Sequence, residues 1–184
     1  MARALVALAN GFEDIEAISV IDILRRGGID VVAASVHETT DVTSAHGVPV
    51  RADALFADVA DDAYEAIVLP GGGEGTSNLA QCEQLIERLR RQKEEELLIC
   101  AICAAPTILV NAGLLDEGQH VTCYPTCSVD LDRPCANVPA VADGCVITGQ
   151  APGSAMLFAL VILQHLIGDN AAQKIARGLV TDVI

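Results

Sequence analysis

The sequence contains little positive charge. Its 184 residues include 11 lysines and arginines against 25 aspartates and glutamates, which gives a formal net charge of −14. Proteins hold nucleic acids through clustered basic side chains that neutralise phosphates. The densest basic cluster, in residues 88–93, is flanked by glutamates and is typical of a solvated helix face. We therefore expect no nucleic-acid partner.

Long apolar runs are also missing. The run at residues 4–9 is too short for a secretory signal or a membrane span. The most apolar later stretch, residues 156–167, carries Gln164 and His165 and suits a core helix. We predict a cytoplasmic protein with no membrane association.

The cysteines do not form a recognisable disulfide or metal-binding pattern. There are seven, an odd number that disfavours a closed disulfide framework. Cys100 and Cys103, like Cys123 and Cys127, are close in sequence, but no second tight pair completes a tetrahedral ligand set. A strand through Cys100 would separate its Cα from that of Cys103 by roughly 10 Å, too far for a disulfide. We expect free thiols and no metal.

Short β-branched or leucine-rich runs alternate with helical patterns along the chain. The predicted strands cover residues 3–9, 31–35, 66–69 and 97–102. The predicted helices cover residues 14–26, 78–96 with a possible break near Gln81, 104–112, 155–167 and about 170–179. This alternation predicts a single α/β domain, residues 1–184, built on a mostly parallel sheet.

Two segments between these elements are predicted to be irregular. Residues 41–50 contain Gly47 and Pro49 between short polar and apolar pieces, which suggests a small antiparallel excursion at the sheet edge. Residues 70–75 are too rich in glycine for any regular element and predict a loop that exposes backbone amides. We see no linker or repeat.

Cys103 is the candidate nucleophile. In open parallel sheets the functional crevice lies beyond the carboxyl ends of the strands, where residues 10–16, 70–75 and 103–106 should converge. A thiol in a strand-to-helix turn meets the helix dipole and free amides, which lower its pKa, as at a nucleophile elbow. The alternative is a buried, inert core thiol. We expect a reactive thiolate.

Glu16 is the candidate partner of Cys103. Glu13, Asp14 and Glu16 begin the predicted first helix, where carboxylates usually cap amides, and that interpretation fits Glu13 and Asp14 best. Glu16 lies further in and should face the same crevice as Cys103. Burial would raise its pKa and keep it protonated, so that it could hydrogen-bond the thiolate.

The glycine cluster after residue 70 has two interpretations. Gly71, Gly72 and Gly73 could form a simple turn, because a lone glycine cluster is weak evidence for anion binding. Beside a nucleophile, the amides of Gly72 and of residues 103–104 could instead donate to the oxyanion that forms when a thiolate attacks a carbonyl. We keep Gly72, Gly73 and Ala104 as candidate oxyanion or substrate-binding residues.

Four segments together resemble the ThiJ/PfpI superfamily, most closely its DJ-one/YajL branch. They are Gly11-Phe12-Glu13-Asp14-Ile15-Glu16, Leu69-Pro70-Gly71-Gly72, Ala101-Ile102-Cys103-Ala104-Ala105-Pro106 and Ala151-Pro152-Gly153. The resemblance implies a flavodoxin-like three-layer α/β sandwich, usually a homodimer, with Cys103 as the reactive cysteine and Glu16 as the protonated carboxyl beside it. It also implies oxidation of Cys103 to a sulfinic acid stabilised by Glu16.

The resemblance further implies a cofactor-free activity on reactive dicarbonyls such as methylglyoxal and glyoxal, of glyoxalase or protein deglycase type. The substrates would be these dicarbonyls or glycated thiol and amine groups. The first hypothesis is therefore a stress-defence enzyme. The second is a redox sensor or oxidative-stress chaperone that acts through oxidation of Cys103. The third is a catalytically silent dimeric scaffold.

The sequence departs from the family pattern at two places. Tyr124 stands where relatives of the human type carry a histidine near the cysteine, which puts a Cys-His dyad in doubt. Ala104 stands where the proteolytic branch has a histidine, so we expect no peptidase activity. Cys123 and Cys127 could act as resolving thiols for Cys103 or could simply pack in the interior. His46 could lie at a dimer contact.

Overall fold

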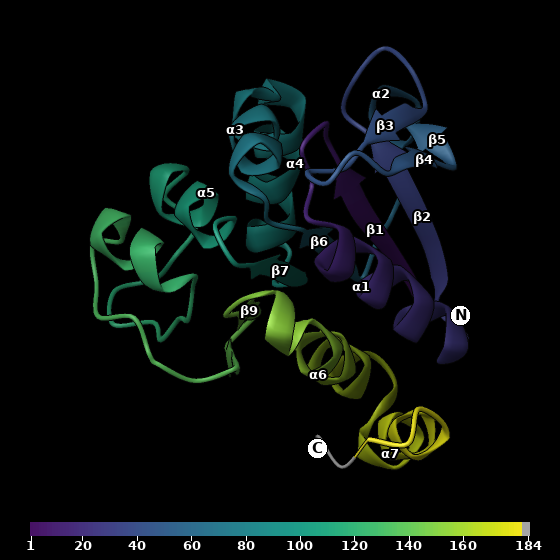
Figure 1. Ribbon diagram of the computed structural model, residues 1–184. Helices are drawn as coiled ribbons and strands as arrows, with labels where there is room; N and C mark the ends of the chain where they lie inside the picture. The colour runs from purple at the N-terminus through teal and green to yellow at the C-terminus, as the bar shows by residue number, and fades with distance from the viewer. Residues whose placement is uncertain (182–184) are drawn as a thin grey trace.

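The computed structural model describes residues 1–181, in which a central sheet lies between two layers of helices (Figure 1). The sheet has seven strands in the order β5-β2-β1-β6-β7-β9-β8, and every neighbouring pair except β8–β9 is parallel. The strands are β1 (Arg3–Leu8), β2 (Asp30–Ser35), β5 (Ala54–Leu55), β6 (Ala66–Leu69), β7 (Leu98–Ile102), β8 (Ala140–Asp143) and β9 (Val146–Gly149). The predicted α/β architecture with a mostly parallel central sheet is confirmed.

Helices cover both faces of this sheet. They are α1 (Asp14–Arg26), α2 (Phe56–Val59), α3 (Gly73–Gln81), α4 (Glu83–Glu94), α5 (Pro106–Asn111), α6 (Ala155–Ile167) and α7 (Asp169–Gly178), with 3-10 turns η1 (Pro125–Asp130) and η2 (Pro152–Ser154). One face packs against α1, α6 and α7, and the other against α2 to α5 (Figure 1). Among residues 1–181, no helix has the length and apolar character needed to cross a membrane.

Strand β1 shows why the sheet is buried on both sides. Successive side chains of a strand point to opposite faces. Ala4, Val6 and Leu8 lie in the core beneath α1 and α6, whereas Leu5 and Ala7 lie in the core on the other face. All five are fully buried, so β1 is apolar throughout, as expected of a central parallel strand.

Helix α1 has the bounds that its apolar stripe predicts. Glu13 is its N-cap, and the Glu13 carboxylate accepts a hydrogen bond from the Glu16 backbone N–H at 2.8 Å. Gly27 follows the last turn, as predicted. The capping role expected of Glu13 is therefore confirmed, and it fixes the start of α1 beside the carboxyl end of β1.

The structure corrects two sequence predictions. Residues 70–75 are not a loop throughout, because α3 begins at Gly73; Gly72 precedes it with a φ of 88°, which glycine tolerates. The helical pattern of residues 78–96 is two helices separated at Cys82, close to the break anticipated near Gln81.

Several small elements were not predicted individually. The hairpin of β8 and β9 adds two strands to the sheet edge after β7. The excursion predicted in residues 41–50 is present as an antiparallel pair, β3 (Asp41–Thr43) and β4 (Pro49–Arg51), which forms its own two-stranded sheet.

Candidate functional site

Three loops meet at the carboxyl edge of the sheet, as the sequence predicts. The Glu13 backbone N–H donates to the Gly71 carbonyl at 3.0 Å, and the Gly75 N–H donates to the Gly11 carbonyl at 3.1 Å. Gly71 follows β6, and Cys103 follows the neighbouring strand β7. Parallel pairing of β6 with β7 therefore brings the glycine loop, the start of α1 and Cys103 to one point.

Cys103 occupies a strained turn between β7 and α5. Its φ is 66°, in the left-handed region that residues other than glycine rarely adopt. The turn is held because the Cys103 N–H donates to the Gly149 carbonyl at 3.0 Å and the Ala105 N–H donates to the Ile102 carbonyl at 3.0 Å. Strain of this kind is typical of nucleophile elbows. The side chain is 8% exposed.

Gly71 lies where Cys103 and Glu16 converge. A Cβ atom built on Gly71 would be 2.6 Å from the Cys103 Cβ and 2.7 Å from Glu16 Oε2. The Gly71 N–H donates to the same Oε2 atom at 2.8 Å. Any larger residue at position 71 would force these two side chains to move. Gly71 thus contributes both a missing side chain and an amide to the site.

Glu16 is a buried carboxyl with one oxygen unused. Its side chain is fully buried, and Oε1 has no hydrogen-bond partner among residues 1–181. Burial raises the pKa of Glu16 from 4.5 to about 7, while the Gly71 amide and the Cys103 thiol partly offset this rise. The predicted direction of the Glu16 pKa shift is confirmed. At neutral pH the carboxyl lies close to its titration midpoint.

The predicted lowering of the Cys103 pKa is wrong for the site at rest. Burial and the charge of Glu16 raise the pKa of Cys103 to about 12, against the smaller opposing effect of the Gly72 and Ala104 amides. Helix α5 is only six residues long and begins at Pro106, three residues beyond the thiol. The dipole of α5 therefore lowers the pKa of the Cys103 thiol too little to offset burial. Glu16 loses its proton first, and the thiol remains beside a carboxylate.

Two of the three candidate oxyanion residues face the sulfur. The backbone amides of Gly72 and Ala104 act on Cys103 and lower the pKa of its thiol. A Cβ on Gly72 would overlap the Gly11 carbonyl, so the close approach of this loop requires glycine. Gly73 is the first residue of α3, and a Cβ built on it meets nothing within 4 Å.

Tyr124 is held against the candidate nucleophile through its backbone. Its N–H donates to the Cys103 carbonyl at 2.8 Å, and its side chain is 41% exposed. The segment that carries Tyr124 therefore forms one wall beside the turn of Cys103. The sequence predicted Tyr124 near Cys103 only through the family resemblance, because no motif or spacing around residue 124 indicates this contact.

The other cysteines differ in their surroundings. Cys100 is fully buried in β7, and burial raises the pKa of its thiol. The strand assignment that excluded a bond between Cys100 and Cys103 is confirmed. Cys123 does not pair with Cys127 in the structure: its Sγ lies 3.1 Å from that of Cys135. This contact was missed because the two cysteines are twelve positions apart.

A second polar cluster lies beside the start of α1. Asp14 accepts hydrogen bonds from the Ser44 hydroxyl and from His46, whose Nδ1 is 2.6 Å from Asp14 Oδ2. Asp14 raises the pKa of His46. Glu13 approaches the same two residues within 4.8 Å. The cluster joins the β3–β4 hairpin to α1, and its Asp14 oxygens are already used by hydrogen bonds.

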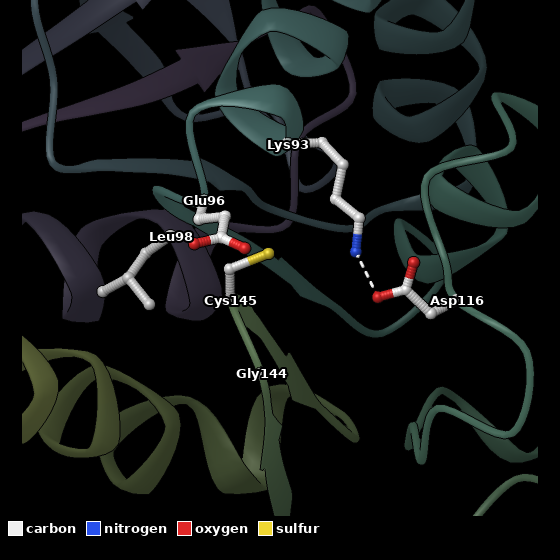
Figure 2. Close-up of a pocket in the computed structure, with 6 residues that line it drawn as sticks. All are labelled: Lys93, Glu96, Leu98, Asp116, Gly144 and Cys145. Atoms are coloured by element: carbon white, nitrogen blue, oxygen red, sulfur yellow. Dashed lines mark hydrogen bonds and ion pairs between the residues drawn. The ribbon is translucent and has the colours of Figure 1, made fainter.

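A separate pocket lies at the opposite edge of the sheet (Figure 2). It has a volume of about 520 Å³ and is lined by Lys93, Glu96, Leu98, Asp116, Gly144 and Cys145. Leu98 begins β7 and Cys145 precedes β9, whereas Cys103 follows the other end of β7. Figure 2 shows Lys93 directed at Asp116, with Nζ 2.6 Å from Oδ2. This pocket is not part of the Cys103 site.

The sequence and the fold of this chain both resemble those of known proteins. A family model described as the DJ-1/PfpI family matches residues 2–165. The chain belongs to this family. The chain is also similar to a solved structure, that of Toxoplasma gondii DJ-1 in an oxidised form. The TM-score is 0.95 and the sequence identity is 35%, and the match covers 99% of this chain and 100% of that chain. The flavodoxin-like fold implied by the resemblance is confirmed.

Curated relatives from plants and animals support the DJ-1 branch. Protein DJ-1 homolog B of Arabidopsis thaliana is 36% identical over 97% of this chain, which spans only 41% of that longer protein. The glutathione-independent glyoxalase DJR-1.2 of Caenorhabditis elegans is 35% identical over 91% of this chain and 89% of its own length. The chain therefore covers about two fifths of the plant relative and most of the nematode one.

Proposed function

We propose that this protein is a cysteine-dependent, cofactor-free glyoxalase that converts reactive dicarbonyls such as methylglyoxal into hydroxyacids. The observation that carries the proposal is the convergence of the Cys103 side chain and the Glu16 carboxyl at Gly71. A nucleophile beside a carboxyl with a pKa of about 7 is the arrangement that general-base activation requires. The glyoxalase name of the nematode relative supports this reaction class.

The first step is addition of Cys103 to the aldehyde. Sγ attacks the aldehyde carbon of methylglyoxal, an S–C bond forms, and the carbonyl π electrons move to oxygen. The thiol proton goes to Glu16, whose Oε1 atom is buried and has no partner among the described residues. The amides of Gly72 and Ala104, which already act on the sulfur, would donate to the new oxyanion. Glu16 then gives this proton to the oxyanion, which completes the hemithioacetal and returns Glu16 to its carboxylate form.

The second step is an internal transfer of hydrogen. The hydrogen on the former aldehyde carbon leaves as a proton, and the neighbouring ketone carbon gains a proton, which Glu16 carries between them. The hydroxyl proton of the hemithioacetal moves to the former ketone oxygen, so that the aldehyde carbon is oxidised to a thioester and the ketone carbon is reduced to an alcohol. Water then cleaves the thioester, which releases the hydroxyacid and regenerates the thiol. No external oxidant or cofactor is consumed, because oxidation and reduction balance within the substrate.

The same chemistry extends to a deglycase. The adduct of a dicarbonyl with a protein thiol or amine presents the same two-carbon unit to Cys103. For this reaction the site beside Cys103 would have to admit the modified side chain of another protein. Tyr124, which is 41% exposed, forms a wall of that site. Small free dicarbonyls need less room, and the buried position of Cys103, 8% exposed, favours them.

A second candidate function is redox sensing through Cys103. The strained turn holds the sulfur against the amides of Gly72 and Ala104, which would also bind the oxygens of a sulfinic acid. Glu16 in its protonated form would donate to the same oxygens. Mass spectrometry after mild peroxide tests this function: we expect two added oxygens on Cys103, and oxidation of other cysteines while Cys103 stays reduced would exclude it.

Turnover of methylglyoxal without glutathione tests the glyoxalase proposal. We expect hydroxyacid formation by wild type and none by Cys103→Ser. Cys100→Ser is the matched control, because Cys100 lies in β7, the strand that Cys103 follows, and is fully buried. Equal hydroxyacid formation by wild type and Cys103→Ser would exclude the proposal, and absence of turnover in wild type would favour the redox function.

A further inference from the structure

We propose that Cys123 and Cys135 are a redox pair that a hydroperoxide converts to a disulfide, which closes the segment of residues 123–135 beside the Cys103 site. The two Sγ atoms are 3.1 Å apart, so formation of a bond of about 2 Å needs only a small approach. This pair is independent of the proposed glyoxalase chemistry, which uses neither residue.

The backbone holds the two cysteines together. Val121 pairs with Cys135 as neighbouring strands do, and the Ala136 N–H donates to the Val121 carbonyl at 2.8 Å. The Thr122 hydroxyl donates to the Ala136 carbonyl at 2.7 Å. Hydrogen bonds therefore lie on the flanks of both cysteines. The thiol contact is built into the fold rather than formed by two free loop ends.

The two thiols differ in their access to solvent, which sets the order of the reaction. Cys135 is partly exposed, whereas Cys123 is 1% exposed. Burial and the neighbouring Cys135 thiol raise the pKa of Cys123. A small oxidant therefore meets Cys135 first, and Cys123 acts as the resolving thiol from the protein interior.

The chemistry balances with one hydroperoxide. The Cys135 sulfur attacks one peroxide oxygen, an S–O bond forms, the O–O bond breaks, and the displaced oxygen takes up a proton and leaves as water or an alcohol. Cys123 then attacks the Cys135 sulfenic acid, an S–S bond forms, and the S–O bond breaks with release of water. Two thiols lose two hydrogens, and the peroxide is reduced by two electrons.

The position of this pair links it to the candidate active site. Cys123 precedes Tyr124, whose N–H donates to the Cys103 carbonyl at 2.8 Å. The Thr122 N–H donates to the Thr148 hydroxyl on β9 at 2.9 Å. A disulfide between Cys123 and Cys135 would therefore join residue 135 covalently to the residue that precedes Tyr124, and so to the wall beside Cys103.

The experiment is peroxide treatment of the full chain followed by alkylation, non-reducing digestion before aspartate residues, and mass spectrometry. Cys123 and Cys127 fall in the peptide of residues 116–129, and Cys135 falls in the peptide of residues 132–142. We expect these peptides to be joined in wild type with a loss of about 2 Da, for the two hydrogens removed, and to separate after reduction.

Three variants make the result specific. Cys127→Ser is the control, because Cys127 is partly exposed in the same peptide and should leave the cross-link intact. Cys123→Ser and Cys135→Ser should abolish it. Circular dichroism checks the fold of each variant. If the variant at the buried Cys123 fails to fold, Cys135→Ser still tests the inference, because Cys135 is partly exposed. The inference is overturned if Cys123 and Cys135 both remain alkylatable after peroxide, or if the peptides are joined through Cys127.

Discussion

Cys103, at the end of β7, and Glu16, in the first turn of α1, meet over a shared neighbour that has no side chain, Gly71. We expect Gly71→Ala to displace one or both groups while leaving them chemically intact. Misplacement of reacting groups by about 1 Å can cost roughly 100-fold in rate, and we expect a loss of that order in turnover of methylglyoxal.

Gly73→Ala is the matched control for that substitution. Gly73 lies in the same glycine cluster, but a Cβ built there meets nothing within 4 Å. Its turnover should stay close to that of wild type. Equal losses in both variants would show that the glycine cluster matters for folding rather than for the approach of Cys103 to Glu16.

Burial of Glu16 should make the stability of the fold depend on pH. Its pKa is about 7 when folded and 4.5 ordinarily, so between these values the folded state holds a proton that the unfolded state has lost. The free energy of unfolding therefore falls as pH rises through this window, by on the order of 3 kcal/mol from Glu16 alone, and levels off above it. Denaturant unfolding at pH 5 and pH 8 measures the change.

Glu16→Gln removes the titrating group while keeping a similar shape. The fall in stability between pH 5 and pH 8 should be smaller in this variant than in wild type, because the glutamine amide stays neutral throughout. An equally steep fall in both proteins would assign the pH dependence to other groups and would contradict a raised pKa at Glu16.

The resemblance aligns Tyr124 with a family histidine, and the structure connects Tyr124 to Cys103 through its backbone. We expect Tyr124→Phe to keep kcat within about threefold of wild type and to change mainly KM, because a backbone contact survives the substitution. Steady-state kinetics with methylglyoxal separates these parameters. A large loss of kcat would give the phenol hydroxyl a role in proton transfer that Glu16 does not cover.

Association into a homodimer stays a prediction, and exposed apolar side chains suggest where to test it. Ile15 and Ile18 on α1 are 55% and 45% exposed, and Val48 on the adjoining hairpin segment is 50% exposed. The contact of Asp14 with His46 holds these two elements together. We expect Ile18→Lys to shift sedimentation towards the monomer, whereas Val129→Lys, at an 83% exposed position, should not.

Unchanged sedimentation of Ile18→Lys, or a monomeric wild type, would contradict a dimer through this face. His46, expected at a dimer contact, is fixed within its own chain by Asp14. Its place in such a contact therefore stays a prediction.

The long elements of the fold could be predicted from the sequence because their apolar spacing is regular. Helices α1 and α6 have the predicted bounds, and β6 does also. The β8–β9 hairpin could not be identified in this way, because β8 is partly exposed and short and its pairing with β9 is set by tertiary contacts. The start of α3 at Gly73 was also not predicted, because a glycine-rich segment is typical of a loop. These glycines adopt a helix once the preceding loop is fixed.

The candidate site was predictable in position but not in its electrostatics. Strand order places Cys103, Glu16 and Gly72 at one edge, because carboxyl ends of parallel strands converge. The balance between burial and amide donors at Cys103 depends on distances that no sequence pattern encodes. For that reason the direction of the Glu16 pKa shift was predicted and that of Cys103 was not.

The pH dependence of kcat/KM for methylglyoxal, in wild type and Glu16→Gln, tests most directly the claim that Cys103 and Glu16 act as one unit. The pair loses its first proton near pH 7, so the wild-type rate should rise through about pH 7 as the base forms. The Glu16→Gln rate should be low and lack this rise. A variant with the wild-type rate and profile would contradict the claim and leave Cys103 without its proposed base.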